Sequence, residues 1–144
     1  MKEANESPVL TRMEEGLALV AGEQVLMGDF TRMLPRLKPG RLSGELLVKA
    51  AKIKKPEGEL MAVDATAGLG EDSILLAAAG FRVRLYERNP VVYKLLRDAL
   101  ERAAQHPELA EIVGRMEAFY ADSLEAMGGL EQPPSVIHKK ATGP

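Results

Sequence analysis

The sequence LMAVDATAGLGEDSILLAAAGFRVRLYERNP, residues 60–90, predicts a strand, a turn of small residues, a helix and a second strand. Its start, LMAVDA, is short, apolar and bounded by small residues, which is typical of a strand buried on both faces of a parallel sheet. Residues 71–79 have acidic side chains in the first turn and apolar ones behind them, so we expect a helix directly after the glycines. FRVRLYE then alternates apolar and polar residues and ends at Glu87, which indicates the second strand of an α/β fold.

The turn of small residues predicts a pocket for a nucleotide-type cofactor. Small side chains let the backbone bend sharply and let a ligand approach the main-chain N–H groups. Glu87 follows the glycines by about 20 residues, the spacing at which a carboxylate can bond ribose hydroxyls. The alternative is a tight strand-to-helix connection that binds nothing. The candidate contacts in the turn are Asp64, Thr66, Gly68 and Gly70.

Two acidic residues decide which cofactor such a turn favours. Glu71 and Asp72 occupy the first turn of the predicted helix, where they would repel the pyrophosphate of a dinucleotide. S-adenosylmethionine has no phosphate and carries a positive sulfonium and a positive amino group, so an acidic rim attracts it. We therefore expect S-adenosylmethionine, and a nicotinamide-dependent oxidoreductase is the disfavoured alternative.

The blocks VDATAGLGEDS and RVRLYERNPVVYKLLRDAL resemble the ribosomal RNA small subunit methyltransferase J family, whose members methylate the exocyclic N2 of a guanine in small-subunit rRNA with S-adenosylmethionine. Weaker resemblance extends through GRLSGELLVKAAKIK and FYADSLEAM. It implies a Rossmann-like class I methyltransferase, with small-subunit rRNA or the 30S subunit as partner. By resemblance, the cofactor contacts would be Glu71 and Asp72, Glu87 and Arg88, and Asp122 and Ser123.

The resemblance stops before the residues that would perform catalysis. In the family, an Asp-Pro-Met-aromatic-Pro motif follows the fourth strand beside the reacting guanine, and these 144 residues contain no such motif. Methyl transfer needs the nitrogen lone pair aligned on the methyl carbon, and the motif would supply this alignment. We expect a truncated chain that binds the cofactor without transferring the methyl group, and no catalytic residue is identified. A non-catalytic module that binds S-adenosylmethionine or RNA is the alternative.

Composition and charge limit the other functions. The chain has a net charge of -2, no cysteine and two histidines, so disulfides are excluded and no metal site is expected. No apolar run is long enough to cross a bilayer, and we expect a cytoplasmic protein. Between residues 31 and 56, eight basic residues face only Glu45, which favours contact with a phosphate backbone over the alternative of a solvated face. The candidate RNA contacts are Arg32, Arg36, Lys38 and Arg41.

We expect two parts, with a boundary at residue 40. Residues 1–40 would form a tail and a β-hairpin lobe in which GLALV and QVLMGDF pair around AGE. Residues 41–144 would form part of a doubly wound, Rossmann-like parallel sheet, with helices on both faces. The predicted strands lie near residues 60–65, 82–86, 116–120 and 134–138. A sheet that stops after four strands leaves an uncovered edge, so we expect self-association there.

Three further local signals concern a connection and two helix starts. LPRLKPG, residues 34–40, contains two prolines and a glycine, which indicates a linker. Ser43 is a candidate N-cap for a following helix whose Leu46 and Leu47 should enter the core. Asn89 should cap a long helix that begins at Pro90.

Overall fold

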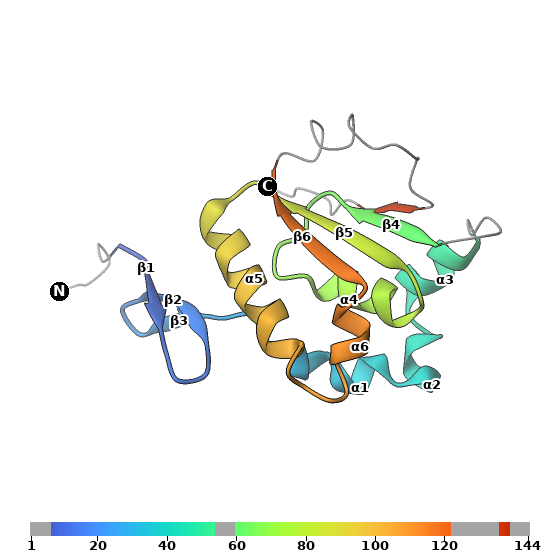
Figure 1. Ribbon diagram of the computed structural model, residues 1–144, viewed down its shortest axis with the longest axis horizontal. Coiled ribbons are helices and arrows are strands. Elements are labelled where there is room, and N and C mark those ends of the chain that lie inside the picture. The colour runs from blue at the N-terminus through green and yellow to red at the C-terminus, as the bar shows by residue number, and fades with distance from the viewer. Residues whose placement is uncertain (1–6, 54–59, 122–135, 139–144) are drawn as a thin grey trace.

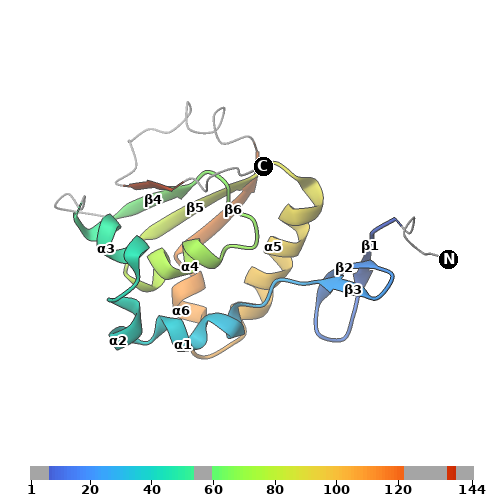
Figure 2. The same ribbon diagram turned by 180° about the vertical axis from the view of Figure 1, so that it is seen from behind.

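The computed structural model describes residues 7–53, 60–121 and 136–138 (Figure 1). It has a small antiparallel sheet near the N-terminus, with strand order β1-β2-β3, and a parallel sheet with order β6-β5-β4-β7. Helices pack against the parallel sheet, and the small sheet lies beside one of them, α5 (Figures 1 and 2). The expected α/β class, with a separate hairpin lobe, is confirmed.

The parallel sheet is built from the four predicted strands. They are β4 Met61–Asp64, β5 Arg82–Glu87, β6 Met116–Tyr120 and β7 Val136–His138. Strand β4 is central, with β5 and then β6 on one side and β7 on the other. The strand order therefore reverses at β4, and in open α/β sheets ligands bind outside the carboxyl ends of the strands at such a point.

The helices that connect these strands lie on one face. Helix α4, Glu71–Ala78, joins β4 to β5, while α5, Pro90–Ala103, and α6, Ala110–Val113, lie between β5 and β6. Two successive right-handed crossovers in the same direction place α4 and α5 on the same face of the sheet. Helices on the other face stay a prediction, because the described residues do not test it.

Local signals account for the start of α5. The Asn89 side chain accepts hydrogen bonds from the N–H groups of Val91 (2.9 Å) and Val92 (3.1 Å), so the predicted cap is confirmed. Leu95 and Leu96 are fully buried.

Of the described helices, none is long and apolar enough to cross a membrane.

The N-terminal sheet contains the predicted hairpin and one further strand. Strands β2, Leu17–Ala21, and β3, Gln24–Leu26, pair antiparallel as expected. Strand β1, Val9–Arg12, was not predicted and pairs with the other side of β2.

The expectation of a linker at residues 34–40 is wrong. This segment contains α1, Leu34–Leu37, and the start of α2, Pro39–Leu42, directly after the 3-10 helix η2, Phe30–Met33. Both prolines lie in the first turn of a helix, where their missing N–H leaves no intrahelical hydrogen bond unmade. Burial of Phe30, Met33 and Leu37 in the core stabilises the segment. A domain boundary at residue 40 stays a prediction, and this packing favours one nearer residue 28.

Two expectations about the next helix are also wrong. Helix α3 is Leu46–Ile53, and Ser43 ends α2 as its C-cap, with helical φ and ψ angles. Leu46 is 82% exposed, whereas Leu47 is partly buried against the core as predicted. A short helix with leucines at adjacent positions can bury only one of them fully, because neighbouring side chains point about 100° apart around the axis.

A buried carboxylate joins the small sheet to α5. Asp98 accepts hydrogen bonds from Arg12 (2.6 Å), from Arg102 (2.9 Å) and from the N–H of Leu17 (2.9 Å). Burial by itself would raise the pKa of Asp98, but the hydrogen bonds from Leu17, Arg12 and Arg102 outweigh it and lower the pKa to about 2. Arg102 also donates to the carbonyl oxygen of Gly28, where the chain leaves the small sheet.

We predict that Asp98→Asn destabilises the protein by about 2 kcal/mol at pH 7. This is the free energy that corresponds to a pKa lowered from 3.8 to about 2. Because the pKa of Asp98 is lower in the folded state than in the unfolded state, its ionised carboxylate stabilises the fold at pH values above the unfolded-state pKa. This stabilisation is lost as the pH falls through the folded-state pKa. The difference from wild type should therefore shrink between pH 5 and pH 2, as measured by urea denaturation. Glu101→Gln is the control, because its exposed pair with Arg97 should contribute about 0.5 kcal/mol or less. Equal stability of Asp98→Asn and wild type at pH 7 would contradict the prediction.

Candidate functional site

The connection from β4 to α4 crosses the carboxyl edge of the sheet at the point where the strand order reverses. Gly68 (φ 55°) and Gly70 (φ 82°) have left-handed backbone conformations, which favour glycine. A Cβ at Gly70 would lie 2.9 Å from Cζ of Phe30 and 3.0 Å from Cδ1 of Leu96. The turn therefore rests directly on the core, and the packing beneath it requires glycine at position 70.

Asp64 fixes the start of this turn. It is completely buried, and its Oδ2 accepts a 2.6 Å hydrogen bond from the Ser73 hydroxyl in α4. Its Oδ1 accepts from the N–H of Thr66 (3.1 Å). The carboxylate thus holds the turn against the first part of α4. A direct contact of Asp64 or Thr66 with a cofactor stays a prediction.

Glu87 closes the turn from the neighbouring strand. Its Oε1 accepts from the N–H of Gly68 (2.9 Å), and its Oε2 accepts from the N–H of Asn89 (3.0 Å). A carboxylate offers about four acceptor positions, so each oxygen retains capacity for another donor. Because Glu87 is only partly buried, two hydroxyls of a ribose fit this remaining capacity. Glu87 therefore fits the ribose of S-adenosylmethionine.

The other predicted contacts divide into those that the structure places and those that it does not describe. Glu71 is exposed and Asp72 partly buried in the first turn of α4, and Arg88 is exposed after β5. Asp122 and Ser123 lie outside the described residues. The last described residue before them, Ala121, donates its N–H to the carbonyl oxygen of Glu87 (3.2 Å), so the chain leaves β6 at the edge of this site.

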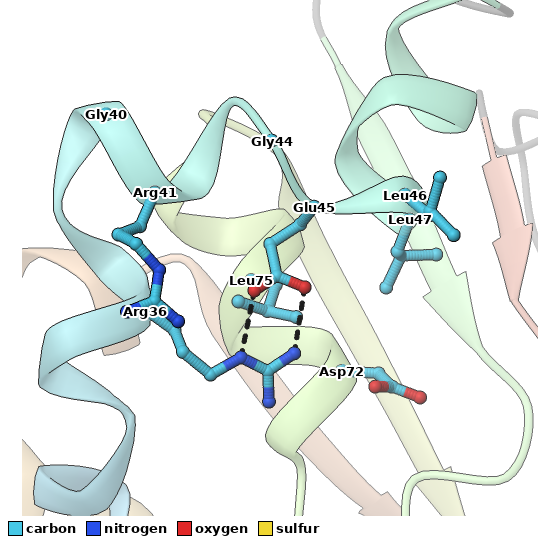
Figure 3. A pocket seen from close by; sticks show the side chains of 9 residues that line it. All are labelled: Arg36, Gly40, Arg41, Gly44, Glu45, Leu46, Leu47, Asp72 and Leu75. Carbon is cyan, nitrogen blue, oxygen red and sulfur yellow. Dashed lines mark hydrogen bonds and ion pairs between the residues drawn. The ribbon is translucent and has the colours of Figure 1, made fainter.

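The predicted RNA contacts lie in two settings. Arg32 and Lys38 are exposed, whereas Arg36 and Arg41 line an open hollow next to the first turn of α4 (Figure 3). Arg36 donates two hydrogen bonds to Glu45, of 2.9 and 2.8 Å. The pair raises the pKa of Arg36 and lowers that of Glu45. RNA binding by the four basic residues stays a prediction.

Aromatic and basic side chains meet near Glu87, although they are separated in the sequence. Tyr120, the partner of Glu87 in the β5–β6 register, is 57% exposed. Its ring centroid lies 5.6 Å from that of Tyr93 in α5. The Arg97 guanidinium lies 5.8 Å from the Tyr93 ring centroid and donates to the Tyr93 hydroxyl (2.8 Å). Sequence reasoning missed this cluster because only the sheet register brings its parts together.

We predict that Gly70→Ala lowers the free energy of unfolding by at least about 2 kcal/mol, because it adds a clash with Phe30 to left-handed backbone strain. The control is Gly80→Ala. Gly80 also has a positive φ, of 110°, but no atom lies within 4 Å of the added Cβ, so it should lose only about 1 kcal/mol. Urea denaturation measures both. Equal losses for the two variants would show that Phe30 does not confine the turn.

Comparison with known proteins identifies a family. Residues 1–140 match the family model described as "Putative SAM-dependent methyltransferase". The chain is 35% identical over 125 residues to ribosomal RNA small subunit methyltransferase J of Acinetobacter baumannii, which covers 86% of this chain and 43% of that protein. The protein of the same name from Serratia proteamaculans is 44% identical over 110 residues, covering 74% of this chain and 43% of the relative.

A solved structure agrees with these matches. The SAM-dependent methyltransferase from Neisseria gonorrhoeae superposes with a TM-score of 0.82 at 26% identity, covering 98% of this chain and 59% of that one. The chain thus spans less than half the length of the two sequence relatives. The fold, the family and the cofactor class expected from the sequence are confirmed. The chain belongs to the family of S-adenosylmethionine-dependent methyltransferases.

Proposed function

We propose that this chain is the cofactor-binding portion of an enzyme that methylates the N2 of a guanine in small-subunit rRNA. The observation that carries the proposal is the Glu87 carboxylate, which bridges β5 to the glycine turn and retains acceptor capacity on both oxygens. The names of the relatives supply the substrate class. A cytoplasmic location follows from that substrate.

Each part of the site has one task in this proposal. The carboxylate of Glu87 accepts from the ribose hydroxyls, and the bare backbone at Gly68 lets the ligand approach the turn closely. The acidic residues Glu71 and Asp72 attract the positive charges of the cofactor. When bound, S-adenosylmethionine supplies a methyl group activated by the sulfonium. Contacts from Asp122 and Ser123 are proposed from the family resemblance alone.

Contact with rRNA is supported by two surface features. Exposed Arg32 and Lys38 suit phosphate groups. The exposed ring of Tyr120, beside Tyr93 and Arg97, offers a face on which an unpaired base can stack. This aromatic cluster favours single-stranded RNA over duplex RNA.

The proposed function and the non-catalytic alternative share one expectation for methyl transfer. Because these residues contain no Asp-Pro-Met-aromatic-Pro motif, we expect them to bind S-adenosylhomocysteine, and not to transfer a tritiated methyl group from S-adenosylmethionine to 30S subunits. Transfer by these residues alone would show that another group among them aligns the guanine. Self-association through the ends of the sheet at β6 or β7 also stays a proposal, which light scattering tests.

We predict that Glu87→Gln weakens binding of S-adenosylhomocysteine by about ten-fold or more, since it removes a charged acceptor from the ribose. Isothermal titration calorimetry measures the affinity. Glu108→Gln is the control, because it removes the same charge from an exposed position in the connection between α5 and α6. Thermal melting should show both variants folded.

Two results would overturn the proposed function. One is that wild type binds neither S-adenosylhomocysteine nor S-adenosylmethionine at millimolar concentration. The other is that NAD binds in their place. Equal affinity of the folded Glu87→Gln variant and wild type would remove Glu87 from the site.

A further inference from the structure

The start of α5 and the end of β6 carry two tyrosines and an arginine that contact one another. We call Tyr93, Arg97 and Tyr120 the tyrosine platform. The chain has three phenylalanines, three tyrosines and no tryptophan. All of these aromatic residues lie among the described ones, and only Tyr120 is exposed. Its ring centroid lies 5.6 Å from that of Tyr93, with the ring planes 36° apart. Tyr93 thus supports part of the Tyr120 ring, and 57% of Tyr120 stays accessible.

Arg97 holds Tyr93 and adds positive charge to the platform. Its Nη1 donates to the Tyr93 hydroxyl (2.8 Å), and its Cζ lies 5.8 Å from the centroid of the Tyr93 ring. Its ion pair with Glu101, in the next turn, is long at 3.8 Å. A guanidinium group has five N–H donors, so Arg97 retains donors for a further acceptor. Lys94, also exposed, is a neighbour of Arg97 on the helix surface, because residues three apart lie on the same side of a helix.

The tyrosine platform lies at the outer side of the sheet, next to the proposed cofactor site. Tyr120 pairs with Glu87 in the β5–β6 register, so both side chains lie on the same face of the sheet. The strand order reverses at β4, and β6 is two strands away from it, or about 10 Å at the usual strand spacing. The platform is at the end of α5 that lies away from α1 and α2 (Figures 1 and 2). A second ligand could therefore contact it beside a cofactor bound at the point of reversal.

The chemistry of the platform suits an unpaired nucleotide. The face of an exposed aromatic ring accepts any base, because every base has a π-face. Positive side chains beside the ring suit the phosphate of the same nucleotide. A base inside a duplex is already stacked on both sides and cannot reach the ring, so only an unpaired base fits. The alternative is that the two tyrosines only anchor α5 to β6. However, the fully buried Leu95 and Leu96 already anchor this part of α5.

We propose that the tyrosine platform binds one unpaired nucleotide of the RNA substrate, with the base stacked on Tyr120 and the phosphate held by Arg97 and Lys94. Tyr93 is a positioning residue, because it supports the ring of Tyr120. The proposal rests on the proposed function and adds the path of the substrate strand, which passes the cofactor on the β6 side of Glu87. This position is distinct from the basic residues of α1 and α2.

The test detects stacking and affinity separately. The probe is a short single-stranded RNA of uridines with one 2-aminopurine, whose fluorescence is quenched when the base stacks on an aromatic ring. The protein contains no tryptophan, so its own emission does not interfere. We expect wild type to quench the probe. Tyr120→Leu should abolish the quenching and weaken binding, measured by fluorescence anisotropy, roughly ten-fold. Tyr120→Phe is the matched control and should preserve both, because it keeps the ring.

The salt dependence of RNA binding tests the phosphate contact. Arg97→Gln should reduce the slope of log affinity against log salt concentration by about 0.7, the value for one phosphate of a single strand. Arg82→Gln is the control, because Arg82 is an exposed arginine at the start of β5, at the opposite edge of the sheet. It should leave the slope unchanged. Equal slopes for Arg97→Gln and wild type would contradict the inference.

Calorimetry with S-adenosylhomocysteine and thermal melting distinguish the remaining outcomes. Three results overturn the inference while wild type binds S-adenosylhomocysteine. Wild type could bind no single-stranded RNA, or bind duplex RNA equally well. Tyr120→Leu could be folded and still quench the probe. Tyr120→Leu could instead weaken S-adenosylhomocysteine and leave RNA binding unchanged, which would assign the ring to the cofactor. If Tyr120→Leu does not fold, the salt slope of Arg97→Gln decides. Failure of wild type to bind S-adenosylhomocysteine would overturn the proposed function itself.

Discussion

The hydrogen bond between the Glu87 carboxylate and the N–H of Gly68 is the interaction on which the site depends. It joins the ends of two adjacent parallel strands, and so sets how far the turn can rise above the sheet. The same carboxylate accepts from Asn89, which in turn caps α5. The glycine turn, the end of β5 and the start of α5 are therefore one connected unit.

The turn is also confined from below. Phe30 from η2 and Leu96 from α5 contact the position of Gly70, and Asp64 holds the turn to α4 through Ser73. The N-terminal segment is thus part of the floor of the site. Burial of Leu37 stabilises α1, and Leu42 of α2 packs against the core while partly buried. These contacts offset the weak intrinsic stability of such short helices.

Much of this fold follows from local sequence signals. The order of strand, small turn, acidic helix start and second strand needs only hydrophobic periodicity, and Asn89 followed by Pro90 specifies where α5 begins. The acidic residues after Gly70 also indicated the cofactor class, which the family match confirms. These features depend on residues within one or two turns of each other.

The features that the sequence did not predict depend on contacts between distant residues. Asp98 binds Arg12 and Leu17, which lie more than 80 residues away, and no local pattern indicates that pairing. The pairing of Arg36 with Glu45 depends on the path of α1 and α2 between them, and the prolines in that segment indicated a linker instead. Periodicity also could not assign the exposed side to Leu46, because α3 is too short to decide between two adjacent leucines.

Helix α5 connects the small sheet to the carboxyl edge of the parallel sheet, where the cofactor would bind. Its 14 residues extend over about 21 Å. Asn89, which Glu87 contacts, caps one end of the helix. Asp98 and Arg102, in its other half, attach it to the small sheet. The β1–β3 sheet and the glycine turn, far apart in the chain, are therefore both anchored to this one helix.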